Sequence, residues 1–351
     1  MPKLPHLAAL FLLSAAPLLG QDTVSYLLSG TDVAIYNLIG EVVVLGGPGS
    51  AVTVEVSRTG RDADRLMVKT GELRGSQTLR VLHPSAEIVY RPLSRGSSTN
   101  FNVRDDGTWG DDRDSQPYRR DGRRVTIRGD GTGLEAAANL RITLPPGRKA
   151  GVYLGMGRLE VADVDGQLKL SAASADVSAR GTKGELEIDT GSGDIRAEQL
   201  EGQVSLNTGS GDVTVTGHRH GAVEIDTGSG SVTGSAVDAS GLEIDTGSGD
   251  IRLEGIRVPR LDLETGSGSI RADLAGQVEV VIMETESGDV TLRLPEGTGA
   301  TLDLDTGSGG FSLDVPVELL KRGEGSLKGR MGDGRGRIHI ETGSGDIALV
   351  K

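Results

Sequence analysis

Short segments in which apolar and polar residues alternate recur throughout the second half of the chain. The segment 185–189 (Glu-Leu-Glu-Ile-Asp) places Leu186 and Ile188 on one side and its acidic residues on the other, which is the two-residue period of a half-buried β-strand. Thr-Gly-Ser-Gly-Asp at 190–194 interrupts the alternation, which resumes at Ile195. Glycine adopts positive φ at no steric cost, so this motif predicts a sharp corner between two short strands, followed by a looser return.

The corner motif or a close variant of it occurs eight times, at steps of 18, 19, 19, 19, 20, 21 and 36 residues, and the last step is close to two ordinary ones. Degraded copies precede it at 170–176 and 153–157. A regular period of this length is typical of stacked repeats. The corners centre on Ser192, Ser210, Ser229, Ser248, Ser267, Ser287, Ser308 and Ser344.

The same apolar columns run through every repeat, from Leu186 and Ile188 to Ile338 and Ile340. One repeat buries too little apolar surface to fold alone, so neighbouring repeats must stack. We therefore predict an all-β fold, a parallel β-solenoid with about 18–21 residues per coil. Right-handed crossovers are strongly favoured for parallel strands and predict a right-handed coil. Antiparallel hairpins in a sandwich are the alternative, although odd and even units would then differ.

The corner threonines are expected to stack inside the coil as a structural ladder of hydroxyl groups. They are Thr190, Thr208, Thr227, Thr246, Thr265, Thr285, Thr306 and Thr342.

The composition agrees with a thin solenoid, because 54 of the 351 residues are glycine and only 3% are aromatic. Residues 1–20 are predicted to be a secretory signal peptide, with Lys3 before an apolar stretch too short to span a bilayer. The chain has no cysteine and therefore no disulfide framework. These features predict an exported protein, periplasmic, cell-surface or secreted, without a membrane span.

Residues 21–150 are predicted to form starting coils or a capping β region, and 151–351 the repetitive solenoid. Strand-like segments occur at 33–36, 42–45, 52–56, 79–82 and 140–144. Between them, the polar stretch 94–133 is predicted to be a loop insertion. It is either a solvated loop, which we favour, or a recognition loop. The binding residues in the second case are Trp109, Tyr118, Arg119, Arg120, Arg123 and Arg124.

Charge is unevenly distributed along the chain, whose formal net charge is −13. Residues 151–351 contain 34 acidic and 18 basic residues, a net charge of −16, whereas the remainder has a net charge of +3. This acidity argues against nucleic acid, whose phosphates require basic surfaces. Cationic peptides, other cationic partners or divalent ions fit it better.

Outward acidic residues form two columns, one before the corner and one after it. Rungs stack about 4.8 Å apart, so neighbouring carboxylates could share a calcium ion. The alternative, which we favour, is that they accept hydrogen bonds from backbone N–H groups of the corner. No other cofactor is expected. The calcium candidates are Asp189, Asp194, Asp212, Asp226, Asp245, Asp250, Asp289 and Asp346.

His218 and His220 belong to a return segment, where two histidines without a third ligand are expected to be exposed polar residues.

Taken together, the opening segment 37–44, the Leu-Pro-Pro-Gly hinge at 144–147, the serial corners and the closing stretch 314–347 resemble the bacterial putative-adhesin family, a domain of unknown function. The resemblance covers nearly all of the chain after residue 20. It implies an exported β-helix-like domain and brings no catalytic residues with it.

Three functions are compatible with these features. The first, which we favour, is a non-enzymatic, adhesin-like structural or binding module that presents its acidic face to a cell-envelope or surface protein or glycan. The second is an envelope-stress or signalling accessory that binds cationic membrane-active molecules. The third is a β-helical carbohydrate-active enzyme, although its carboxylates would have to depart from the repeat rather than belong to it.

Overall fold

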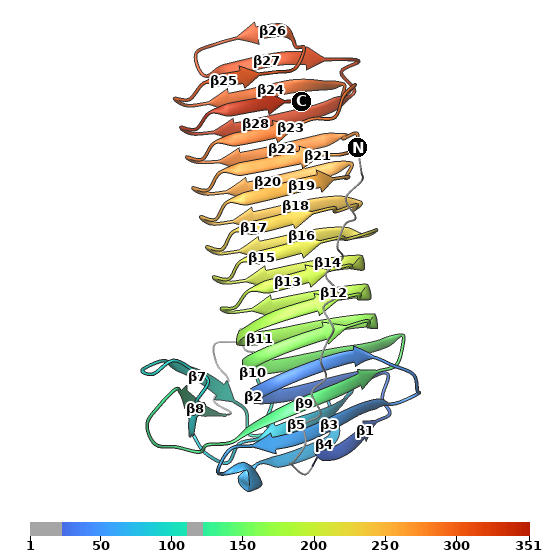
Figure 1. Cartoon of the computed structure of the whole chain (residues 1–351), viewed down its shortest axis with the longest axis vertical. Coiled ribbons are helices and arrows are strands. Elements are labelled where there is room, and N and C mark those ends of the chain that lie inside the picture. The colour runs from blue at the N-terminus through green and yellow to red at the C-terminus, as the bar shows by residue number, and fades with distance from the viewer. Residues whose placement is uncertain (1–22, 111–121) are drawn as a thin grey trace, which may run out of the picture.

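A long rod of stacked strands stands on a broader β-rich foot in the computed structural model, which describes residues 23–110 and 122–351 (Figure 1). The predicted signal peptide at 1–20 lies outside these residues. Within the described ranges the one helix is the single turn η1 (Ala63–Arg65). No helix there has the length and apolar character needed to cross a membrane.

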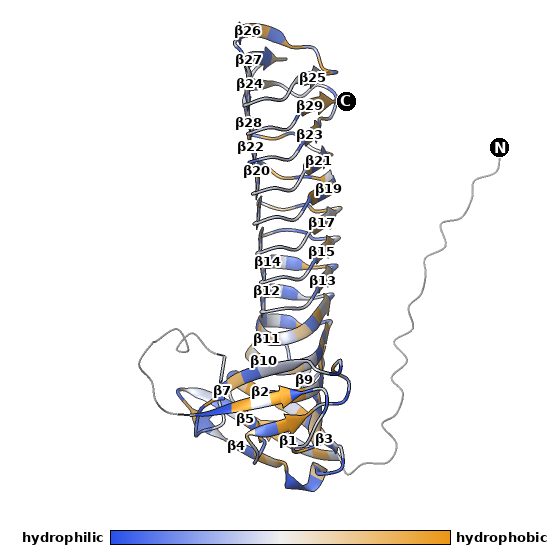
Figure 2. Cartoon of the chain, turned by 90° about the vertical axis from the view of Figure 1, so that its left-hand side faces the viewer, coloured by the Kyte–Doolittle hydropathy of each residue, from blue (hydrophilic) through white to orange (hydrophobic). Residues whose placement is uncertain are grey.

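Each rung of the rod is a pair of strands on opposite faces, and the corner motif joins them (Figure 2). The first face contains β12 (Lys183–Thr190), β14 (Glu201–Thr208), β16 (Ala222–Thr227), β18 (Gly241–Thr246), β20 (Arg260–Thr265) and β22 (Val280–Thr285). The second contains β13 (Ile195–Glu198), β15 (Val213–Thr216), β17 (Val232–Ser235), β19 (Ile251–Ile256), β21 (Ile270–Leu274) and β23 (Val290–Arg293). Below them, β10 (Arg148–Ala162) and β11 (Asp165–Arg180) run continuously through both faces.

Neighbouring rungs pair in parallel and in register, so equivalent residues of the repeat stack directly. Leu186 aligns with Val204, and Val204 with Val223. The degraded copies follow the same register, since Ala172 aligns with Thr190 and with Leu154. The predicted parallel solenoid is confirmed, and the antiparallel sandwich is wrong for these repeats. The hand of the coil stays a prediction.

The core is the narrow space between the two faces, where the inward columns of the repeat are buried. A third buried column lies in the return segments and contains Leu200, His218, Val237 and Ile256. The expectation that His218 is exposed is wrong, because its side chain takes an aliphatic position of this column. Burial lowers the pKa of His218 and favours the neutral imidazole.

The corner threonines confirm the predicted hydroxyl ladder and show how it works. The Thr246 hydroxyl donates to the carbonyl oxygen of Gly230 on the preceding rung (2.9 Å) and accepts from the N–H of Gly249 in its own corner (3.1 Å). One buried hydroxyl therefore closes its corner and ties that corner to the neighbouring rung. All eight corner threonines donate to a carbonyl in this way.

The corner glycines are required for a reason that differs from the predicted one. Neither Gly247 nor Gly249 has a φ between +20° and +160°. A Cβ atom on Gly249 would instead lie 1.8 Å from the carbonyl oxygen of Gly230, and one on Gly247 would lie 2.4 Å from that of Gly228. The position of Gly249 is glycine in all eight corners, because it stacks so closely that only glycine leaves room for the backbone of the next rung, whereas the position of Gly247 is taken by Glu286 in one corner.

The last rung in the sequence is not the last rung in space. It consists of β28 (Gly336–Thr342) and β29 (Ile347–Val350), which lie between the β22–β23 rung and the rung of β24 (Ala300–Thr306) and β25 (Phe311–Leu313). The 36-residue step holds an antiparallel hairpin, β26 (Glu318–Arg322) and β27 (Ser326–Met331), that pairs with β24 and caps the rod.

The foot contains a further rung in the same register, β2 (Asp32–Gly46), which pairs in parallel with β10. β5 (Ser76–Leu82) and β9 (Ala137–Leu144) continue the two faces below β2. Antiparallel strands complete this end, namely β1 (Thr23–Leu28), β3 (Val52–Thr59) and β4 (Met67–Leu73). All five strand-like segments predicted before residue 150 are strands.

A small second sheet packs beside the foot, made of β6 (Glu87–Val89), β7 (Ser98–Val103) and β8 (Arg123–Arg128). β7 and β8 fall in 94–133, so the expectation of a loop is wrong for these residues. Phe101, Val103, Val125 and Ile127 are buried in a separate apolar cluster with Trp109. The alternation of these residues along the two strands is the sequence signal for this sheet.

The corner hydroxyl predicts a graded loss of stability. Thr246→Val keeps the shape of the side chain but leaves a buried donor and a buried acceptor unpaired, which costs about 1–3 kcal/mol. Thr246→Ser keeps both hydrogen bonds and loses only a methyl group. Urea unfolding followed by circular dichroism is expected to give a lower free energy of unfolding for the valine variant than for the serine variant. The opposite order would show that apolar packing, and not the hydroxyl, stabilises the corner.

His83, which follows β5, predicts how stability depends on pH. Burial lowers the pKa of His83 from 6.5 to about 4, so the folded chain holds the neutral ring while the unfolded chain takes up a proton below about pH 6.5. The contribution of the neutral His83 to the free energy of unfolding is therefore fully present above that pH and is lost on acidification. The expected loss from His83 is about 2 kcal/mol between about pH 7.5 and about pH 5.

Chemical denaturation of the native chain and of His83→Gln at the two pH values measures this contribution. The predicted quantity is how much more unfolding free energy the native chain loses between the two pH values than the variant loses. This difference does not depend on the stability of the variant at neutral pH. Equal losses would contradict the prediction.

Candidate functional site

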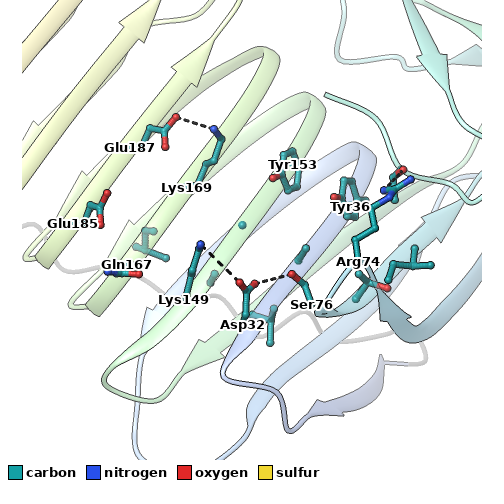
Figure 3. Close-up of a pocket in the computed structure, with 18 residues that line it drawn as sticks. Asp32, Tyr36, Arg74, Ser76, Lys149, Tyr153, Gln167, Lys169, Glu185 and Glu187 are labelled. Carbon is teal, nitrogen blue, oxygen red and sulfur yellow. Dashed lines mark hydrogen bonds and ion pairs between the residues drawn. The ribbon is translucent and has the colours of Figure 1, made fainter. Parts of the chain in front are cut away.

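A pocket of about 600 Å³ lies where the first face of the rod meets the foot (Figure 3). Its floor is the outward side of β2, β10, β11 and β12. The turn between β4 and β5 supplies Leu73 and Arg74, and Thr108 completes that wall. The pocket therefore combines the flat face of the solenoid with two segments of the foot.

Two stacked tyrosines form the centre of the floor. Tyr36 and Tyr153 are register partners on β2 and β10, and their rings lie parallel with centroids 4.5 Å apart. Gly151 makes room for this arrangement, because a Cβ atom there would lie 3.0 Å from the ring of Tyr153 and 3.3 Å from its hydroxyl oxygen. The rings are almost entirely buried, so they shape the floor.

Charged side chains around the tyrosines occur as opposite pairs. Lys169 and Glu187 are 2.8 Å apart, and Lys149 Nζ lies 3.8 Å from a carboxylate oxygen of Asp32. Ser76 donates a hydrogen bond of 2.8 Å to the other oxygen of Asp32. With Arg74 and Glu185, the lining contains three cationic and three anionic side chains. The pocket is strongly polar but carries no net charge.

None of these pocket residues was singled out from the sequence. The available signal was a small residue two positions before a tyrosine, in Ala34-Ile35-Tyr36 and again in Gly151-Val152-Tyr153. Both tyrosines occupy the same column of the repeat. That equivalence becomes visible only once β2 is known to be a rung.

Higher on the same face, one column of the repeat forms an acidic row. Its members are register partners on consecutive rungs, about 4.8 Å apart. Burial and the neighbouring carboxylate of Asp226 raise the pKa of Asp245. Burial, followed by Asp245, Glu284 and Asp262, raises the pKa of Glu264. We call the acidic row the residues Asp226, Asp245, Glu264, Glu284, Glu341 and Asp305.

The acidic column after the corner has a different role. The carboxylate of Asp194 accepts from the backbone N–H of Asp212 (3.0 Å), and that of Asp250 accepts from Ser269 (2.9 Å). This hydrogen bond, followed by Arg252, lowers the pKa of Asp250. The predicted acceptor role is confirmed, but the donor belongs to the next rung rather than to the same corner. Asp212, Asp289 and Asp346 bond in the same way.

The other calcium candidates, Asp189, Asp226 and Asp245, lie on the first face in the column before the corner. Among the residues that the structure describes, one group has at least three potential metal ligands close together: Asp303, Asp305 and His339, whose ligand atoms lie within 4.8 Å of one another. Lys328 already holds Asp303 at 2.8 Å. None of the eight candidates belongs to this group, and calcium binding stays a prediction.

Of the six candidates for a recognition loop, the structure describes Trp109, Arg123 and Arg124. Trp109 is only 4% exposed and packs edge-on against Phe101, 5.6 Å between ring centroids, so it is a core residue and not an exposed anchor. Arg123 donates to the carbonyl oxygen of His83, and Arg124 to the side chain of Asn100. Tyr118, Arg119 and Arg120 lie outside the described residues.

One family model matches more than half of the chain. The family model described as Toastrack DUF4097 matches residues 109–350. Two similar crystal structures are a putative cell adhesion protein from Clostridium sporogenes (12% identity, 94% of this chain and 99% of that chain, TM-score 0.21) and a putative adhesin from Bacteroides fragilis (9% identity, 95% and 99%, TM-score 0.31). No curated protein matches the chain.

Proposed function

This chain belongs to the Toastrack DUF4097 family, and we propose that it is an exported, non-enzymatic, adhesin-like module that binds cationic molecules of a cell envelope or cell surface through its acidic row. Export rests on the predicted signal peptide at 1–20. The adhesin-like character rests on the family resemblance of the corners and the closing stretch.

The observation that carries the proposal is the row of like charges on the first face. Six carboxylates stack on consecutive rungs from β16 to β24. Burial, together with the neighbouring like charges, disfavours the ionised carboxylates and raises the pKa values of Asp245 and Glu264. A cationic partner relieves this repulsion, so the acidic row favours the binding of cationic molecules.

The same geometry disfavours the carbohydrate-active enzyme. Glycoside hydrolysis uses two carboxyl groups in different environments, one that stays protonated and one that is ionised. Here Asp226, Asp245 and Glu264 are equivalent members of one repeated column. Nothing in their position distinguishes an acid from a nucleophile.

Neutralising two members of the acidic row is expected to weaken binding to a cationic probe. Asp245→Asn combined with Glu264→Gln should reduce affinity for a fluorescent oligolysine peptide by about threefold to tenfold, since each exposed ion pair contributes about 0.2–1 kcal/mol. Fluorescence anisotropy at low and at physiological salt measures the effect. Binding of the native chain should weaken as salt rises.

The matched control is Glu198→Gln combined with Glu254→Gln, which changes the net charge equally on the second face. This control should bind the peptide almost as well as the native chain. If it loses as much affinity as the first variant, total charge and not the acidic row governs binding, and the proposal is wrong. Melting temperatures should show both variants folded, and the acidic-row variant no less stable than the native chain.

A further inference from the structure

We infer that the pocket at the foot of the rod is a second binding site, one that takes a neutral polyhydroxylated ligand such as the sugar units of a surface glycan. It is distinct from the acidic row. The pocket lies on β2, β10, β11 and β12, whereas the row begins at β16. The two sites can therefore be tested separately.

The shape of the pocket is built by the fold. Its volume of about 600 Å³ falls in the range of small-ligand sites. The floor is flat because strands stack in register, and the ring of Tyr153 lies over Gly151, where a side chain would displace it. The labelled polar side chains in Figure 3 come from the strands of the floor, from the adjoining turn at Arg74 and from the first residue of β5, Ser76.

The spacing of the charged pairs favours hydroxyl groups as ligands. Lys149 Nζ and the nearest oxygen of Asp32 are 3.8 Å apart, too far for a hydrogen bond. A group between them must accept from the ammonium and donate to the carboxylate. A hydroxyl does both, and a sugar carries several at fixed positions. The Lys169–Glu187 pair and the side chains of Gln167 and Glu185 offer further donors and acceptors along the same floor.

Charged ligands and extended peptides fit the pocket less well. Three cationic and three anionic side chains cancel, so neither an anion nor a cation gains from the field of the pocket as a whole. A peptide strand binds by adding to an open sheet edge. The floor strand β10 is already paired with β2 on one side and with β11 on the other. The floor presents side chains and no free backbone edge.

Titration of the full chain with neutral trisaccharides tests the inference. Cellotriose, maltotriose and tri-N-acetylchitotriose serve as probes, with a sulfated disaccharide and oligolysine for comparison, and a printed array of neutral glycans extends the panel. Calorimetry measures affinity. The fluorescence of Trp109, the one tryptophan in the sequence, gives a second readout because the preceding residue, Thr108, lines the pocket.

Two variants alter the pocket and one serves as the control. Lys169→Met removes a pair from the floor, and Gly151→Ala pushes the ring of Tyr153 toward the cavity. Lys183→Met removes a similar exposed pair, Lys183–Glu201 at 3.7 Å, from outside the pocket. Lys169 is partly exposed, so its variant is expected to fold even if Gly151→Ala does not.

At least one neutral glycan is expected to bind, with affinity about tenfold lower in Lys169→Met and unchanged in Lys183→Met. Three results would overturn the inference: no neutral glycan binds, only the sulfated or the cationic probe binds, or Lys169→Met and Lys183→Met bind equally. Oligolysine binding through the acidic row should survive in Lys169→Met. Failure of one site therefore leaves the other unaffected.

Discussion

The close approach of backbones at the corners is the constraint on which the structure depends. Gly249 passes so near the carbonyl of Gly230 that no Cβ atom fits, and the hydroxyl of Thr246 bonds to that same carbonyl. Glycine permits the contact and threonine holds it. Because every corner repeats this arrangement, strands on both faces stay in register over the whole rod, and equivalent side chains stack at a fixed spacing.

That fixed spacing explains why two acidic columns of one repeat behave differently. After the corner, each carboxylate meets a backbone N–H of the next rung, which lowers the pKa of Asp250. Before the corner, carboxylates stack on one another, and burial together with the neighbouring carboxylates raises the pKa of Glu264. The column after the corner stabilises the stack, whereas the column before the corner leaves charge on a flat face where a partner can reach it.

The sequence predicted what is repeated. Alternation fixed the strands, the shared columns fixed their parallel register, and the buried threonines followed from their invariant place in the corner. Prediction from the sequence failed for features that occur only once in the chain. Residues 94–133 have no period, so the paired alternation of Phe101 and Val103 with Val125 and Ile127 was missed. The pocket combines β2, β10 and the turn at Arg74, which no linear period connects.

The place of β28 and β29 also has a consequence for the order of assembly. A solenoid can ordinarily grow by adding coils in the order of synthesis. Here the final strand pair sits between two earlier ones, so β24 and β25 lack their parallel partners until the carboxyl end of the chain arrives. The parallel pairing of β24 and β25 therefore forms only after β28 and β29 have been synthesised, although β24 and β25 precede them in the sequence.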